Sequence, residues 1–478
     1  MKDKVKVYIS NLKKCENLPE WIAVLAVLLF SMFTMFYSDF QGTMDFAYQV
    51  TREIMHGNVN AIANLAANSY GMTMAIVLII WMIPFCIFTL PFGKEFWYFG
   101  SIAGAIWSKL FLLVMTVFLL KAMEKLAILL NIKKENRKWI PLFLITSVFY
   151  FLPVVEIGQC DIIALTFMMW GIVFYIKGDL KKFLAFFAFA IPMKYFPLMV
   201  FVPLVLLHEK KPLKIILQGI CGGSLLGINL IIRKFVWGSV VGSFTSDAIG
   251  KISSTSNSIA ELEEVSQNAT VYIESNAIEA FFGHFISNAS LFVMCYILIC
   301  ILAYALKYDS NKCIWSVYIP FLVFCGFFTL TEANVYWIVL MLPYMVLLIF
   351  SNASQLRLNM LLETIAGWAM LFIYMFKMPW VVGGESTFEY IFLKGNTVGS
   401  NMETYFRHVV DLTGLLPYAY SAYIACMIGI ILVNIPMFKK ENEGIIENQS
   451  FDRWIIWSRI GLVLVWVLLL VYVLLMRR

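Results

Sequence analysis

The sequence predicts an all-α, polytopic membrane protein, a bundle of about 12–14 transmembrane or re-entrant helices. Of its 478 residues, 61% are hydrophobic and only 14% are charged, against roughly 25% charged in an ordinary soluble domain. The apolar residues form long runs, such as 21–37, 72–90 and 455–475, which match the roughly 20 residues that cross a hydrocarbon core. These observations exclude a water-soluble globular protein.

Charge and cysteine usage narrow the class further. The 36 basic and 30 acidic residues give a net charge of +6, and the basic ones form short clusters between apolar runs. This pattern indicates membrane orientation and no nucleic-acid partner. The nine cysteines contain no CxxC pair, so neither a disulfide framework nor a zinc site is expected. We expect no metal and no cofactor.

The N-terminal half begins with residues 1–20, which are basic and therefore expected in the cytoplasm. Residues 21–37 are expected to be a retained first span, because no small-residue cleavage site follows them. An outer loop is expected over 38–71, with helix-forming residues around 45–55. A second span then returns inward over 72–91.

Three basic clusters next mark the cytoplasmic side, at residues 133–138, 177–182 and 208–214. The apolar stretches between them must enter and leave by the same face. Residues 139–176 are long enough for a helical hairpin with its tip at 153–161. Residues 183–207 are too short for two crossings at about 1.5 Å per residue. We expect them to form a broken pair with its tip at 191–197, buried in protein or lining a cavity.

The C-terminal half, 215–478, is treated as a second module that follows a catalytic module over 21–214. Outer loops are expected at 233–288 and 377–414, with a tight turn at 331–334. The apolar runs predict spans at 215–232, 290–306, 314–330, 336–350, 358–376, 416–437 and 455–475.

Two assignments conflict with this count. Residues 96–120 lie between Lys94 and Lys121, both of which the rule for basic residues places inside. The terminal Arg477 and Arg478 fall on the outer side. Either one assignment is wrong or the chain contains another short hairpin.

Carboxylates beside apolar spans are functional candidates. Asp39 comes where the first span meets the outer surface, and a carboxylate there can accept the proton of an incoming hydroxyl as a general base. The alternative is an ordinary helix cap. Asp45 follows on the same expected helix, where a solvated face is the simpler interpretation.

The expected hairpin tip carries Glu156, Gln159 and Asp161 between two strongly apolar helices. Such side chains need partners or a cavity. They either contact a ligand or join helices to one another by hydrogen bonds. Gly158 between them allows close approach of the backbone.

Three more polar residues are candidates for ligand binding. Lys194 is the only cation inside a 25-residue apolar stretch; it either extends toward a membrane surface or pairs with a buried anion such as phosphate. Glu332 and Asn334 occupy the turn between two spans and are weaker candidates. The chain lacks a Walker loop, a GxSxG elbow and an HExxH motif, which argues against nucleoside-triphosphate chemistry, serine hydrolysis and zinc hydrolysis.

Three features together resemble the GT-C superfamily of membrane glycosyltransferases. They are Asp39 outside the first span with its loop reaching Gly57, the run 151–161 that ends Gly-Gln-Cys-Asp, and the run 191–198 that contains Lys-Tyr-Phe-Pro. They are most similar to the bacterial branch related to polyprenyl-phosphate-mannose-dependent alpha-mannosyltransferases. The resemblance is clearest over residues 35–210.

This resemblance implies a many-helix GT-C bundle in the cell membrane, with its active site at the extracytoplasmic surface. It implies a polyprenyl-phosphate sugar donor and a glycan or glycolipid acceptor. Asp39 matches the family's catalytic base, with Asp45 as its rival, and Lys194 matches a partner of the donor phosphate. Two other functions stay open: a flippase or transporter of lipid-linked glycans, and a polymerase or ligase of surface glycans.

Overall fold

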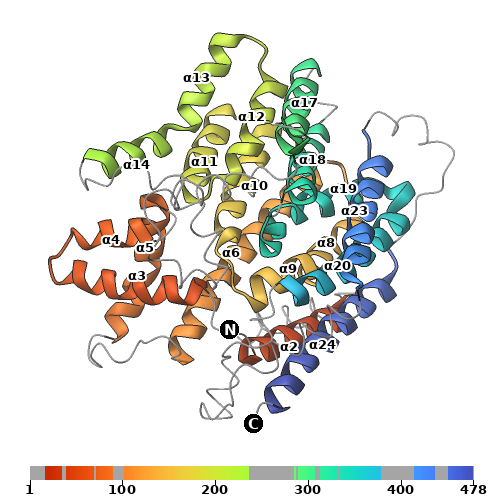
Figure 1. Ribbon diagram of the computed structural model, residues 1–478, viewed down its shortest axis with the longest axis horizontal. Coiled ribbons are helices and arrows are strands. Elements are labelled where there is room, and N and C mark those ends of the chain that lie inside the picture. Colours follow the sequence, from red (N-terminus) through yellow and green to blue (C-terminus); the bar gives the residue numbers. More distant parts are fainter. Residues whose placement is uncertain are drawn as a thin grey trace, which may run out of the picture. The chain divides into compact units, whose positions relative to one another are not determined.

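The computed structural model describes residues 17–34, 39–68, 71–89, 102–235, 285–286, 289–306, 313–331, 333–377, 414–436 and 451–476. These residues fold almost wholly into helices (Figure 1). Two short strands, β1 (Phe285–Ile286) and β2 (Ala289–Ser290), pair antiparallel, with Phe285 opposite Ser290. Most of the expected outer loops 233–288 and 377–414 lies outside the described residues.

Within this part of the chain, five helices are long and apolar enough to cross a membrane. They lie at Met72–Thr89, Ala103–Leu129, Ala353–Phe376, Leu416–Val433 and Arg453–Tyr472. Two helix pairs, each bent by 51°, pass the same test together and raise the number to seven. Further apolar helices have 10–17 residues. The chain is therefore an all-α, multi-pass membrane protein, while the full count of 12–14 helices stays a prediction.

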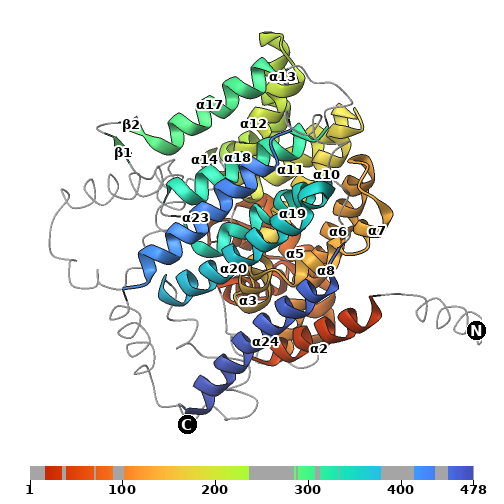
Figure 2. The same ribbon diagram turned by 90° about the vertical axis from the view of Figure 1, so that its right-hand side faces the viewer.

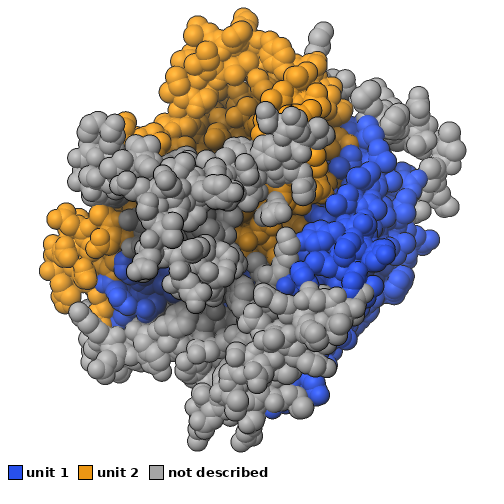
Figure 3. Space-filling model, viewed as in Figure 1, with its two compact units in different colours: residues 1–49, 81–162, 342–478 blue, residues 50–80, 163–341 orange. Residues whose placement is uncertain are grey.

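The chain divides into two compact units, which Figure 3 shows in different colours. Unit 1 comprises residues 1–49, 81–162 and 342–478, and unit 2 comprises residues 50–80 and 163–341. Three of the four boundaries fall within α3 (Asp39–Met55), α5 (Met72–Thr89) and α10 (Asp161–Ile176), and the fourth falls directly before Leu342.

The other helices of unit 1 are α2 (Leu18–Thr34), α6 (Ile102–Leu129), α7 (Lys134–Arg137), α8 (Ile140–Ile145), α9 (Val148–Tyr150), the π-helical turn η3 (Phe151–Glu156), α19 (Leu342–Ser351), the 3₁₀ turn η6 (Ala353–Gln355), α20 (Leu356–Lys377), α23 (Leu416–Val433) and α24 (Arg453–Met476). Those of unit 2 are α4 (Ala61–Asn68), α11 (Leu180–Met193), α12 (Phe196–His208), α13 (Pro212–Gly222), α14 (Ser224–Phe235), α17 (Leu291–Ala305), α18 (Trp315–Leu330) and the 3₁₀ turn η5 (Val335–Leu340).

In unit 1, α2 and α24 lie side by side in both views (Figures 1 and 2). Their first turns are joined, because Arg453 Nη2 lies 2.7 Å from Glu20 Oε1. The two helices are therefore parallel, and α24 ends at the face opposite to the start of α2. At the same end Asn17 Nδ2 donates to the Lys138 carbonyl at 3.1 Å. Asn17 and Lys138 of the 133–138 cluster thus lie at the same end of this helix pair.

Unit 2 is built around the pair α11 and α12, with α13 and α14 against α11, and α17 and α18 against α12. The side chain of Asp179 accepts from the Lys182 backbone N–H at 3.2 Å and so caps α11. The Lys182 side chain, bound to the same carboxylate, holds the pKa of Asp179 below its usual value. Gly222 lets α13 approach closely, because a Cβ at this position would lie 2.2 Å from the Phe201 ring.

Three features of the fold differ from the sequence predictions or refine them. The expected single span 215–232 is a bent pair, Pro212–Gly222 and Ser224–Ile232, since the consecutive glycines 222 and 223 weaken the helix at that point. The expected outer loop 38–71 contains α3 and α4. The stretch 96–120 contains no cytoplasmic end at Lys121, because α6 continues through this residue to Leu129.

Candidate functional site

The hairpin tip predicted at 153–161 coincides with a break between η3 and α10. Pro153 supplies no N–H to a helix ladder, and the chain forms a π-helical turn here. The turn is closed by the Gln159 N–H, which donates to the Pro153 carbonyl at 2.8 Å. Gly158 has φ +73°, a left-handed conformation that glycine adopts without a Cβ clash. These features end η3 at Glu156 and place Gln159 and Asp161 at the start of α10.

Lys109 of α6 stabilises the end of this π-helical turn. Its Nζ donates to the carbonyls of Val155 and Glu156 at 3.2 and 3.4 Å. The last carbonyls of a helix lack partners within the helix and carry partial negative charge. A buried ammonium at this position supplies the missing hydrogen bonds and offsets the partial charge. Lys109 is only 6% exposed. Its charge also interacts with the Glu156 carboxylate, and one of its three N–H groups remains for another acceptor.

Two side chains at the break after η3 are buried without a hydrogen-bond partner in the part of the chain that the structure describes. Both carboxylate oxygens of Glu156 and the amide nitrogen of Gln159 are in this state. The two residues are 0% and 2% exposed. A buried polar group without a partner costs about 1–3 kcal/mol, and more when it is charged. Lys109, Glu156 and Gln159 are here called the Glu156 cluster. Asp161 is fully buried next to it.

The start of α3 lies at the same level along α6 as Lys109. The Phe40 ring stacks on Phe111 with ring centroids 6.3 Å apart, and Phe111 is two residues beyond Lys109. Two residues turn a helix by about 200°, so Phe40 and the carbonyls bound by Lys109 contact nearly opposite faces of α6 at one level. Asp39 is the first residue of α3, so the helix begins earlier than the expected helix-forming stretch around 45–55, and the Asp39 side chain lies outside the described residues.

The rival base candidate, Asp45, is half-buried in the second turn of α3. Its Oδ2 accepts from Gln49 Nε2 at 3.0 Å, one helical turn further along. The interpretation of Asp45 as a residue of a solvated helix face is therefore incomplete, because this carboxylate is only partly open to solvent.

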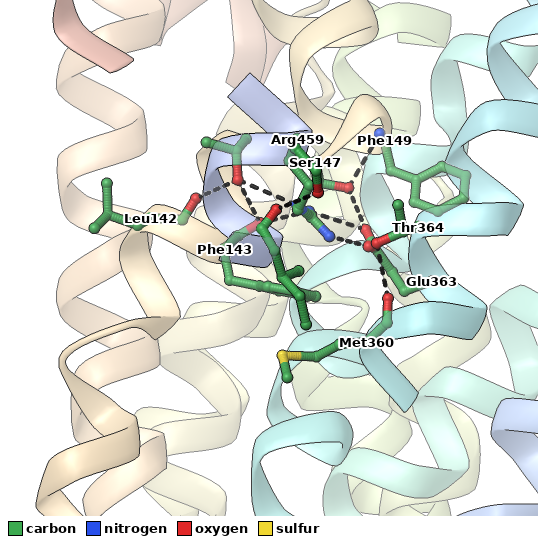
Figure 4. A network of polar contacts seen from close by, with 11 residues as sticks. Leu142, Phe143, Ser147, Phe149, Met360, Glu363, Thr364 and Arg459 are labelled. Atoms are coloured by element: carbon green, nitrogen blue, oxygen red, sulfur yellow. Dashed lines mark hydrogen bonds and ion pairs between the residues drawn. The ribbon is translucent and has the colours of Figure 1, made fainter. Parts of the chain in front are cut away.

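A second buried polar cluster in unit 1 is fully bonded (Figure 4). Arg459 of α24 forms a buried ion pair with Glu363 of α20. Arg459 Nη2 also donates to the Phe143 carbonyl at 2.7 Å, and its Nε donates to Thr146 Oγ1 at 3.2 Å. Ser147 Oγ donates to Glu363 Oε1 at 2.6 Å and accepts from the Phe149 N–H. These residues, here called the Arg459 cluster, join α20 and α24 to the bend between α8 and α9.

Unit 2 holds the remaining predicted residues. Lys194 is buried at the break between α11 and α12, which confirms the expected break at 191–197. Its Nζ lies 5.6 Å from the Trp337 ring centroid and 5.9 Å from that of Phe196. Asn334 Nδ2 donates to the Tyr336 hydroxyl at 3.0 Å, so this amide has a local partner. Glu332 lies outside the described residues.

The sequence predictions missed two buried charged residues, Glu363 and Arg459. From the sequence, Lys109 fits either membrane orientation or contact with a phosphate. All three lie inside apolar spans, and this position is the signal that marks them, because an ionisable residue within a span is costly. Their roles depend on pairing between distant segments, which one sequence does not reveal.

The described residues contain no group of three or more His, Cys, Asp or Glu side chains that could hold a metal ion. No protein-family model, no curated protein and no solved structure matches the chain.

Proposed function

We propose that the protein is a membrane glycosyltransferase of the GT-C type. It moves a sugar from a polyprenyl-phosphate donor to an acceptor hydroxyl at the extracytoplasmic face, with Asp39 as general base. The observation that carries the proposal is the Glu156 cluster, in which a buried carboxylate and a buried amide nitrogen have no hydrogen-bond partner among the described residues.

Two further observations support a polar substrate inside the membrane protein. The helices break at both runs on which the resemblance depends, after Glu156 and at Lys194. Irregular backbone at membrane depth is tolerated where it is buried in protein or lines a cavity. Breaks at these two runs favour binding of a ligand over simple spanning of the bilayer.

The chemistry is a single displacement. The Asp39 carboxylate takes the proton of the acceptor hydroxyl, whose oxygen forms a bond to the anomeric carbon. The bond from that carbon to the phosphate oxygen breaks, and polyprenyl phosphate leaves with the electron pair. A cation beside the leaving phosphate stabilises the developing charge, and Lys194 stays the prediction for this role.

The test uses the purified full-length protein in liposomes with labelled undecaprenyl-phosphate hexoses and glycolipid extracts as acceptors. We expect labelled product from the wild type and a loss of at least about 100-fold in Asp39→Asn, since a general base contributes about 10²–10⁴ in rate. Asp45→Asn is the matched comparison, because it makes the same change six residues along α3.

Three outcomes would contradict the proposal or part of it. Absence of transfer with every hexose would contradict the transferase. Movement of the intact labelled lipid to the other leaflet without product would favour a transporter. Full activity in Asp39→Asn together with loss in Asp45→Asn would move the role of base to Asp45.

A further inference from the structure

The hydrogen-bonding groups of the Glu156 cluster define which kind of ligand it can bind. Among the described residues, the Glu156 carboxylate has no donor at either oxygen, and the Gln159 amide nitrogen has no acceptor. Lys109 has donated to two carbonyls and has one N–H left. A group that satisfies the cluster must therefore supply at least two donors and one acceptor.

Charge narrows the class of this group. One carboxylate and one ammonium give the cluster no net charge, and both are buried. A phosphate supplies mainly acceptors and would meet the unpartnered Glu156 carboxylate, which repels it. An ammonium ligand would meet Lys109 in the same way. A neutral hydroxyl both donates and accepts, so two neighbouring hydroxyls satisfy Glu156, Gln159 and Lys109 together.

We propose that Lys109, Glu156 and Gln159 form a saccharide subsite that binds neighbouring hydroxyl groups of the sugar, and not the donor phosphate. The choice of a sugar among neutral polyols rests on the proposed function. In this subsite Glu156 accepts from two hydroxyls, while Gln159 and Lys109 donate to their oxygens. Lys109 has a second task, since it also holds the end of η3 in place.

The experiment compares two probes on the full-length protein in lipid nanodiscs. The dissociation constants of undecaprenyl phosphate and of undecaprenyl-phosphate hexoses are measured for each variant. We expect the wild type to bind at least one hexosyl form about tenfold more tightly than the bare phosphate, as one hydrogen bond to a charged group allows. Glu156→Gln and Gln159→Leu should reduce this ratio to about twofold or less and leave binding of the bare phosphate unchanged.

Ser108→Ala is the matched control. Ser108 neighbours Lys109 on α6 and is equally buried, but its hydroxyl donates to the Gly104 carbonyl of its own helix at 2.8 Å. This variant should keep the wild-type ratio. Saturation-transfer NMR with free hexoses on the wild type provides a second measurement that does not depend on any variant folding.

Several results would overturn the subsite. One is a wild-type ratio near one with no NMR signal from free hexoses, which would mean that water fills the cluster. Another is a ratio that persists in both variants. Weaker binding of the bare phosphate in Glu156→Gln would assign the cluster to the phosphate instead. Hexose binding without transfer would support the subsite and contradict the proposed transferase. Transfer together with an unchanged binding ratio in both variants would support the transferase and contradict the subsite.

Discussion

The two buried polar clusters of unit 1 differ in one respect that matters for function. The Arg459 cluster pairs its carboxylate with a guanidinium and a hydroxyl, whereas the Glu156 carboxylate receives no hydrogen bond from the described residues. Both clusters lie on the same broken helix, at the bend before α9 and at the end of η3. Both clusters therefore bury a charged carboxylate. They differ in whether that carboxylate receives hydrogen bonds from neighbouring side chains. A satisfied cluster holds helices together, and an unsatisfied one is available to a ligand.

The largest effect is expected from Arg459→Met. This change leaves the Glu363 carboxylate buried without its counter-ion, which typically costs about 3–5 kcal/mol. It also removes the donor to the Phe143 carbonyl. The midpoint of unfolding in detergent or lipid micelles should fall accordingly. The double variant Glu363→Leu with Arg459→Met should lose less than the single one, because no unpaired charge remains. Equal or larger loss in the double variant would show that the pair itself stabilises the fold.

A smaller loss is expected from Lys109→Met. The carbonyls of Val155 and Glu156 lose their donor, and the Glu156 charge loses its only neighbouring cation among the described residues. Unsatisfied buried groups of this kind cost about 2–3 kcal/mol in total. Unfolding should also begin near η3, which hydrogen exchange of the residues around Gly158 would detect. Unchanged exchange there would mean that Lys109 does not hold the turn.

Ser147→Ala should cost about 2 kcal/mol. The variant removes a hydrogen bond to the charged Glu363 carboxylate, worth about 1.5–3 kcal/mol. It also removes the helix cap that accepts from the Phe149 N–H, worth about 1 kcal/mol. The two losses do not add fully, because both involve the same hydroxyl. Thermal unfolding checks the size of the loss. A loss below about 0.5 kcal/mol would show that Arg459 alone satisfies Glu363.

The smallest effect on stability is expected from Glu156→Gln. The substitution keeps the shape of the side chain and removes a buried charge that receives no hydrogen bond from the described residues, so stability should stay within about 1 kcal/mol of the wild type or rise. Thermal unfolding in the same micelles measures the change. A loss as large as that of Arg459→Met would identify Glu156 as structural and remove the contrast between the clusters.

Much of the helical framework could be predicted from the sequence, because length and apolarity decide it. The expected spans 290–306 and 314–330 agree with α17 and α18 within one residue at each end. Proline, glycine and polar residues inside apolar stretches also predicted the breaks near Glu156 and Lys194. These signals are local, and each acts through the backbone at its own position.

What could not be predicted depends on contacts between distant segments. Lys121 suggested a cytoplasmic boundary, yet α6 continues past it to Leu129. A lysine is tolerated within such a helix because its side chain can extend along the helix toward water. The pairing of Glu363 with Arg459 joins residues 96 positions apart, and no local pattern predicts it. The same holds for Lys109, whose partners are carbonyls of another helix. The sequence marked Glu156 and Gln159, but only the fold places Lys109 against the Val155 and Glu156 carbonyls.

The most direct test is the rate of hexose transfer by Glu156→Gln, measured at the same folded fraction as the wild type. We expect this variant to be as stable as the wild type and to transfer at least about tenfold more slowly at low donor concentration, since it lacks one ligand contact. Wild-type transfer by a fully folded Glu156→Gln protein would contradict the claim that the unsatisfied carboxylate serves the substrate.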